Sequence, residues 1–467
     1  MLISGRTIQG IGAGGIYVLL DIICCDLVPL RERGIHPLQF LYDKTTVSSN
    51  NTRTGKYLGL MFSWAGLAAA LGPVVGGALA QSNWRWIFYL NIPICVVALA
   101  TILLFMRVQY TRSSSYTLSQ SLARIDYLGN LIFIPSIIAI LFGLTMGGIQ
   151  YPWSSWRIIF PLVLGFLGWI AFHIHQSSPI CAEPSIPARL FSNRTSATAF
   201  ILTFTSSIIV QMQSYFLPVY FQAVKGTTAL QAGVSFLPFA IGTLVFAVLA
   251  GTLLSKYGAY RPLHAAAFIL SSVGFGLFTL LQGDSARAAW VCFQLIASAG
   301  AGLVLSVLLP AIMAALPESD VAASSAAYSF VRTFGYIWGV TLPSIIFNAR
   351  FNSHLSHISD IGVRGLLADG ASYAYASEQF INTLEPQTRR EVLDVYLISL
   401  KAVWWMGIAI SLVSFLAVGG ERELQLRKEL ETEYGLDKGQ TSIQTQAKDQ
   451  KEKATDGDTG ERVVDEE

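Results

Sequence analysis

The sequence predicts an all-α polytopic membrane protein, and two observations support this prediction: the composition and the length of the apolar runs. Hydrophobic residues make up 53% of the 467 residues, whereas charged residues make up only 13%. A soluble domain carries roughly twice that share of charge. Eleven apolar runs are each long enough to cross about 30 Å of hydrocarbon as a helix.

The apolar runs follow one another along the chain as candidate membrane spans. They cover roughly residues 5–25, 56–80, 86–107, 127–147, 157–175, 197–221, 232–254, 263–281, 288–315, 322–348 and 396–419. Residues 1–25 thus hold the first span, 56–175 spans two to five, 197–348 spans six to ten and 396–419 the last span. The expected connections are cytoplasmic loops at 26–55 and 176–196, a long extracellular loop at 349–395, and a charged cytoplasmic tail at 420–467. The extracellular loop suits an ordered cap and a flexible cover equally well.

The distribution of basic residues predicts that the amino terminus lies outside and the carboxyl terminus lies in the cytoplasm. Basic residues gather in alternate connections, as with Arg31 and Lys44 in the first, while the opposite connections carry mostly single charges such as Arg85. In this orientation the glycosylation acceptor patterns that begin at Asn50 and Asn193 face the cytoplasm. We therefore expect neither to carry a glycan.

Other classes of function find little support in the sequence. The net charge of +2, without a basic patch, indicates no nucleic-acid binding. His173 and His175 are too close for the i, i+4 pair of a helical metal site, and His354 and His357 lack further ligands. The five cysteines lie mostly in apolar runs and are interpreted as packing residues. With no nucleophile–base arrangement and no P-loop, we expect no enzyme, no metal and no cofactor.

The segment around Pro73 is the most informative in the chain. Small residues surround this proline at fixed spacing, namely Gly59, Ala68, Gly72, Gly76 and Gly77. A proline inside a helix kinks its axis, and glycines on one face let a neighbouring helix approach to backbone contact. We interpret the segment as a packed hinge. The alternative is a small-residue packing seam in some other polytopic protein.

Further motifs occur in other apolar runs, and together they point to one family. They are Arg6, Gln9, Gly10 and Gly12 in the first run, Tyr215, Leu217 and Pro218 in the sixth, and Phe330, Arg332, Gly335 and Gly339 in the tenth. Together with the Pro73 segment they resemble the fourth, ninth, thirteenth and fifth helices of fungal-type fourteen-span drug:proton antiporters of the major facilitator superfamily. The resemblance covers roughly residues 1–420, with Ala68 where the family usually has glycine.

The chain also departs from this family in two places. If the run at 5–25 corresponds to the fourth helix, three spans are missing before it, and we expect an amino-terminal truncation. Residues 35–54 interrupt a passage that is short in the family, and this polar stretch looks like a retained intron or a tolerated insertion.

The resemblance implies the major facilitator fold and a proton-coupled secondary transporter that exports drugs, toxins or secondary metabolites by alternating access. It implies a monomer in a lipid bilayer, the plasma membrane rather than the vacuolar membrane, with protons and a small organic substrate as partners. Two alternatives stay open. One is uptake or vacuolar transport of basic amino acids or siderophores, and the other is a truncated membrane fragment that does not transport.

Three charged residues inside the runs are candidates for proton coupling. The resemblance implies this role for Arg6. The alternative is that its side chain only snorkels to the membrane–water interface. Arg332 lies about 15 Å into its span, and its alternative is a structural partnership with carbonyls or amides. Asp21 could carry protons because burial raises a carboxyl pKa, although a solvated boundary acid explains it equally well.

Amide and aromatic side chains in the later runs are candidates for a substrate cavity. These residues are Gln211, Gln213, Tyr215, Tyr220, Gln222 and Trp404. Amides can hydrogen-bond an amphipathic organic molecule and aromatic rings can stack on it. Each could equally hold helices together.

Overall fold

The computed structural model describes residues 2–27, 68, 71–105, 125–179, 181, 184–317 and 320–424. Within these ranges the regular structure is helical, apart from one isolated bridge between Gly147 and Tyr151. Gly59, the atypical segment 35–54 and most of the charged tail lie outside the described residues.

Nine of the described helices are long and apolar enough to cross a membrane. They are α4 with α5 (Trp86–Tyr89 and Asn91–Phe105), α7 (Tyr127–Met146), α8 (Trp156–Gln176), α9 (Arg194–Val219) with its π-helical end η2 (Tyr220–Val224), α10 (Ala229–Tyr257), α11 (Arg261–Phe278), α12 (Arg287–Leu305) with α13 (Leu308–Ala314), α14 (Val321–His354) and α17 (Pro386–Val418). The helix α1 (Leu2–Leu27) and residues 71–82 are helical as well. Each of the eleven apolar runs therefore contains a helix, which confirms the predicted fold class.

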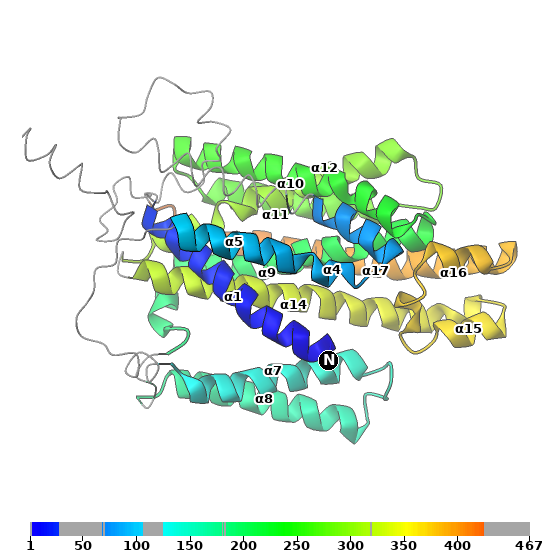
Figure 1. Cartoon of the computed structure of the whole chain (residues 1–467), viewed down its shortest axis with the longest axis horizontal. Coiled ribbons are helices and arrows are strands. Elements are labelled where there is room, and N and C mark those ends of the chain that lie inside the picture. Colours follow the sequence, from blue (N-terminus) through cyan, green and yellow to red (C-terminus); the bar gives the residue numbers. More distant parts are fainter. Residues whose placement is uncertain are drawn as a thin grey trace, which may run out of the picture.

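The helices α9 to α14 and α17 form one bundle with a continuous apolar core (Figure 1). Within it α10 and α11 pack on α12, while α9, α14 and α17 pack on one another. Large aromatic side chains fill the interior, and Phe216, Phe275 and Trp404 are each at most 1% exposed. This bundle is the framework on which the rest of the described chain is arranged.

The earlier helices lie around this bundle. The hairpin of α7 and α8 reaches it through Phe133, whose ring lies 5.6 Å from that of Phe330 on α14. The helix α1 crosses α14 obliquely (Figure 1). The apolar side chains of α5 are exposed, including Leu103 and Leu104, as expected for a surface that faces lipid.

Local sequence signals explain where several helices begin and end. The side chains of Asp126, Ser155 and Asn193 accept hydrogen bonds from the first turns of α7, α8 and α9. Thr228 opens α10 with a reciprocal capping box. Gly258 ends this helix with φ of 71°, a left-handed conformation that glycine adopts without a steric penalty.

The connection between α14 and α17 is an ordered cap, which we define as residues 355–385. It contains the short helices η4 (Leu355–His357), α15 (Ile361–Leu367), η5 (Ala371–Tyr373) and α16 (Glu378–Thr383). Its side chains Ile358, Leu367 and Ile381 are fully buried, and the hydroxyl of Tyr396 on α17 donates to the carbonyl of Ser372. Of the two forms that the sequence left open, the structure has the ordered one.

Candidate transport site

The helical residues 71–82 meet the start of α10 at backbone contact. A Cβ atom placed on Gly77 would lie 2.5 Å from the carbonyl oxygen of Ala229, closer than real Cβ atoms come. A Cβ on Gly233 would collide with the carbonyl oxygen of Pro73 in the same way. Only glycine fits at these two positions, because any side chain would force the backbones apart. By contrast, no atom of the described residues lies within 4 Å of the corresponding position on Gly72 or Gly76.

The start of α10 is held firmly in place for this contact. Its capping box satisfies the first turn, and the preceding Gly226 has φ of 60°. Lys225 donates from its ammonium group to the carbonyls of Gly283 and Ser285, at 3.0 and 2.8 Å. The end of η2 and the connection between α11 and α12 are thereby tied together beside the contact.

A second close approach lies between α9 and α14, which run in the same direction. A Cβ on Gly335 would lie 2.6 Å from Cβ of Ser207, and one on Gly339 would lie 2.8 Å from Cβ of Gln211. The two glycines are four residues apart and so share one face of α14. We call this contact the α9–α14 seam.

Polar atoms without a hydrogen-bond partner occur on both helices of the seam. Gln213 on α9 is fully buried, and neither its amide nitrogen nor its amide oxygen has a partner among the residues that the structure describes. On α14 the same holds for the buried indole nitrogen of Trp338 and the side-chain oxygens of Asn348 and Asn352. A buried polar group left unpaired costs about 1–3 kcal/mol. Such atoms are available to hydrogen-bond a ligand or water.

Aromatic rings continue along α14 beside these polar atoms. Phe330 and Phe334 stack with a centroid separation of 5.8 Å, and Phe334 lies 5.9 Å from both Phe204 and Trp338. The seam thus combines stacking faces with amide and indole groups. This is the chemistry that binds amphipathic organic molecules.

Among the six predicted cavity residues, Gln211 lies at the seam. Gln213 is two residues further along α9, about 200° around the helix from Gln211, and is fully buried. The ring of Tyr215 instead stacks on Tyr373 of the cap at 5.0 Å. The hydroxyl of Tyr220 donates to the carbonyl of Gln282 at 2.8 Å.

The two remaining candidates lie elsewhere in the bundle. Gln222 is partly buried in η2. Trp404 is 1% exposed and packs 5.2 Å from Phe278 and 6.1 Å from Phe275, in the contact between α11 and α17. A hollow of about 480 Å³ lies at the ends of α11 and α17 and is lined by none of the six; its lining is Arg261, Pro262, Ala265, Phe415, Leu416, Val418 and Gly419.

Two of the predicted coupling residues lie beside amide or aromatic groups. The guanidinium of Arg6 donates to the amide oxygen of Gln9 at 2.8 Å and lies 5.8 Å from the ring of Phe88. Arg332 lies 5.2 Å from the ring of Tyr328. Asp21 lies in α1, and its side chain is outside what the structure describes. In the same helix, no atom of the described part of the chain lies within 4 Å of a Cβ placed on Gly10 or Gly12.

The structure also reveals a buried histidine–glutamate pair that the sequence reasoning missed. Both carboxylate oxygens of Glu421 lie 2.9 Å from Nδ1 of His264, and both side chains are fully buried. Next to this pair, the hydroxyl of Tyr260 donates to the carbonyl of Arg422 and accepts from the backbone of Leu424. Burial raises the pKa of Tyr260 to about 12, so the hydroxyl stays protonated at neutral pH.

We call residues 421–424 with His264 and Tyr260 the carboxyl-terminal clasp. The only available signal was a histidine one turn into an apolar run and an acid directly after Gly419 and Gly420. Neither pattern predicts a partner by itself. The clasp closes one end of the bundle by joining the end of α17 to the start of α11.

Comparison with known proteins decides the family. The family model described as Major Facilitator Superfamily matches residues 1–340. The chain belongs to the major facilitator superfamily. It is 44% identical over 438 residues to the MFS efflux transporter aclA of Aspergillus oryzae, a match that covers 94% of this chain and 75% of that protein. It is 40% identical over 445 residues to the MFS-type efflux pump LUC4 of a Fusarium species, covering 95% and 75%.

One solved structure matches the chain at a low level. It is a bacterial homolog of the human lysosomal transporter Spinster in an inward-facing and occupied conformation, with 12% identity and a TM-score of 0.41 over 89% of this chain and 96% of that one. The fungal relatives agree with the predicted resemblance, which is thus confirmed.

Proposed function

We propose that this protein exports a small organic molecule across a membrane in exchange for protons. The observation that carries the proposal is the backbone contact of Gly77 with Ala229 and of Pro73 with Gly233. It joins the proline-containing helix to α10 without an intervening side chain. Relatives of 40–44% identity that are named efflux transporters or efflux pumps support the direction of transport.

In this mechanism the glycine contact is one of the surfaces that close and open during alternating access. Backbones that meet directly can form a tight seal at one end of the transport path. When the same two surfaces separate, that end of the path opens. Few side-chain interactions are lost, because the backbones meet without side chains between them. The kink that Pro73 introduces lets the helix bend as it separates.

The α9–α14 seam is the proposed place for substrate. Stacking on Phe334 and Trp338 would hold a planar apolar part of the molecule. The indole nitrogen of Trp338, which has no partner among the described residues, would donate a hydrogen bond to a polar group of the molecule. A surface of this kind accepts many shapes, because it relies on area and a few adaptable hydrogen bonds.

Proton coupling is assigned to Arg6, Arg332 and Asp21. A fixed guanidinium favours the ionised form of a nearby carboxyl group and so sets the pH at which that group gives up its proton. We further propose a monomer in the plasma membrane with no catalytic activity. Uptake and vacuolar loading are the competing functions, and the names of the relatives favour export over both.

The test is transport by sealed vesicles that contain the purified chain and a fluorescent amphipathic drug. We expect an imposed proton gradient to drive drug movement, and an uncoupler to abolish it. Drug movement in the opposite direction to the proton flow supports exchange, whereas movement in the same direction would support uptake. No movement in vesicles that hold correctly folded chain would overturn the proposal.

A further inference from the structure

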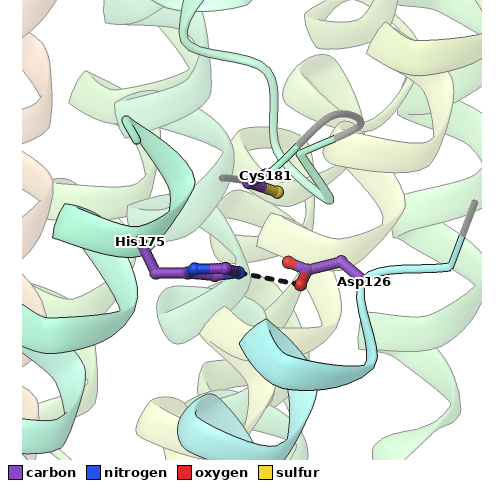
Figure 2. A group of neighbouring side chains, drawn as sticks. All are labelled: Asp126, His175 and Cys181. Carbon is purple, nitrogen blue, oxygen red and sulfur yellow. Dashed lines mark hydrogen bonds and ion pairs between the residues drawn. The ribbon is translucent and has the colours of Figure 1, made fainter. Parts of the chain in front are cut away.

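Three side chains with metal-binding atoms converge at the ends of α7 and α8. Asp126 precedes α7, His175 lies in the last turn of α8, and Cys181 follows α8 in the connection to η1 (Ala188–Phe191). One ligand atom from each lies within 4.8 Å of those from the other two. Figure 2 shows the three side chains directed toward one another from three separate segments.

The spacing of these atoms is close to that of a tetrahedral zinc site. Nε2 of His175 lies 3.0 Å from Oδ1 of Asp126. Zinc bonds of about 2.0–2.2 Å to nitrogen and oxygen place such ligand atoms roughly 3.3 Å apart. A zinc ion can therefore replace the proton that the two groups share, and the sulfur of Cys181 needs to approach by only about 1 Å.

The surroundings hold Asp126 in this position. The side chains of Asp126 and His175 are only 5% and 11% exposed. The backbone N–H of Gly129 donates to Oδ1 of Asp126 at 2.8 Å, and Nε2 of Gln176 donates to Oδ2. Hydrogen bonds of this kind orient the ligands of metal sites.

An unsatisfied acceptor lies beside the cluster. The side-chain oxygen of Gln176 is buried and has no hydrogen-bond partner in the described part of the chain. A metal-bound water is a strong donor and would supply the missing hydrogen bond. Asp126 caps the first turn of α7 and contacts His175 and Gln176, and these contacts account for the positions of both side chains. They leave the side-chain oxygen of Gln176 without a donor.

We propose that Asp126, His175 and Cys181 bind one Zn²⁺ ion, with water as the fourth ligand. A set of one sulfur, one nitrogen and one oxygen favours zinc over magnesium or calcium, which prefer oxygen alone. The bound ion joins the α7–α8 hairpin to the chain that leads into α9. The spacing of His173 and His175 predicted no metal, because Asp126 lies 49 residues from His175 in sequence.

The experiment uses the purified full chain in detergent, stripped of metal by a chelator and titrated with Co²⁺. We expect one cobalt ion per chain, with the thiolate-to-cobalt charge-transfer absorption that only a bound cysteine gives, and displacement by stoichiometric zinc. Cys181→Ser should remove the charge-transfer band, and His175→Gln should weaken binding by about tenfold or more. Matched controls are His173→Gln and Cys292→Ser, which should keep both the band and the affinity.

Either of two results would overturn the proposal. One is no binding at micromolar cobalt by chain that retains its helical circular dichroism. The other is a charge-transfer band that survives Cys181→Ser, which would assign the thiolate to another cysteine. Metal binding is measured without transport, so its failure is separate from failure of the proposed export.

Discussion

Arg6 illustrates how much the role of a charged residue depends on its partner. Its partner in the structure is the neutral amide of Gln9, and the ring of Phe88 lies close to the guanidinium. A guanidinium held by an amide and a ring keeps its full charge and a fixed orientation. These are the properties that a residue needs if it is to set the electrostatics of proton exchange elsewhere in the path.

For Arg6 we predict a graded loss of coupling. Arg6→Ala should abolish proton-driven export while leaving substrate binding largely intact, and Arg6→Lys should restore only part of it because an ammonium lacks the planar donor fork. The measurement is drug-induced proton movement in sealed vesicles, read beside drug binding in the same membranes. If Lys serves as well as Arg, the side chain merely snorkels, and full exchange by the Ala variant removes Arg6 from coupling.

The clasp provides a prediction about stability. Glu421→Ala leaves His264 buried without its partner, and loss of one member of a buried pair costs about 3–5 kcal/mol. We expect a clearly lower thermal unfolding temperature in detergent. Glu423→Ala is the control, because Glu423 is exposed and accepts only one backbone hydrogen bond from Tyr260. Equal unfolding temperatures for the two variants would show that the buried pair adds nothing.

At the scale of residues, the sequence did not predict the partners of individual side chains, and the proposed cavity roles stay predictions. Tyr220 and Trp404 were candidates for a cavity because amphipathic rings suit ligands, but the structure gives them carbonyl and aromatic partners inside the bundle. Nothing in a single apolar run distinguishes these environments, since the difference depends on which helix packs against it. The His264–Glu421 pair was missed for the same reason.

At the scale of elements, the small residues around Pro73 divide by the face on which they lie. Gly77 meets the backbone of α10, whereas a Cβ on Gly72 or Gly76 would meet no atom within 4 Å in the described ranges. Gly76 and Gly77 are about 100° apart around a helix, so a neighbour that contacts one does not reach the other. The sequence predicted that a helix would approach closely, but it did not predict which helix or which glycine.

This difference gives a matched pair of variants. In Gly77→Ala the new methyl group would collide with the carbonyl of Ala229, and overpacking of this kind costs about 1–3 kcal/mol. We expect slow or absent export, because the contact with α10 cannot close. Gly76→Ala should transport normally and unfold at the same or a slightly higher temperature, since alanine favours helix. The two export rates in vesicles decide the matter: similar rates would mean that closure does not use this contact.

Helix positions were well predicted, but two ends were not. The tenth apolar run was expected to end at 348 and the last to begin at 396, whereas α14 continues to His354 and α17 begins at Pro386. The added turns are polar and lie beyond the length that hydrocarbon requires, so hydropathy does not detect them. They carry the cap, which is the ordered one of the two forms that the sequence left open for this connection.

For the whole molecule, the arrangement of helices follows from the apolar runs, and the orientation in the membrane remains a prediction from charge. The carboxyl-terminal clasp joins the ends of α9, α11 and α17 where Arg194, Arg261 and Arg422 gather. The cap lies at the opposite end of the bundle (Figure 1). If basic residues stay inside, the clasp is cytoplasmic and the cap is outside.

Glycan acceptors can test this orientation from both ends. Asn193 caps α9 near the clasp, so its acceptor pattern should remain unmodified. His357→Asn creates a new acceptor with Ser359 on the exposed surface of the cap, and it should gain a glycan there. The measurement is a glycosidase-sensitive mobility shift after expression in a fungal cell, with Asn193→Gln as the control that changes nothing. A shift in the unaltered chain that disappears in Asn193→Gln would instead place the clasp outside and the cap in the cytoplasm.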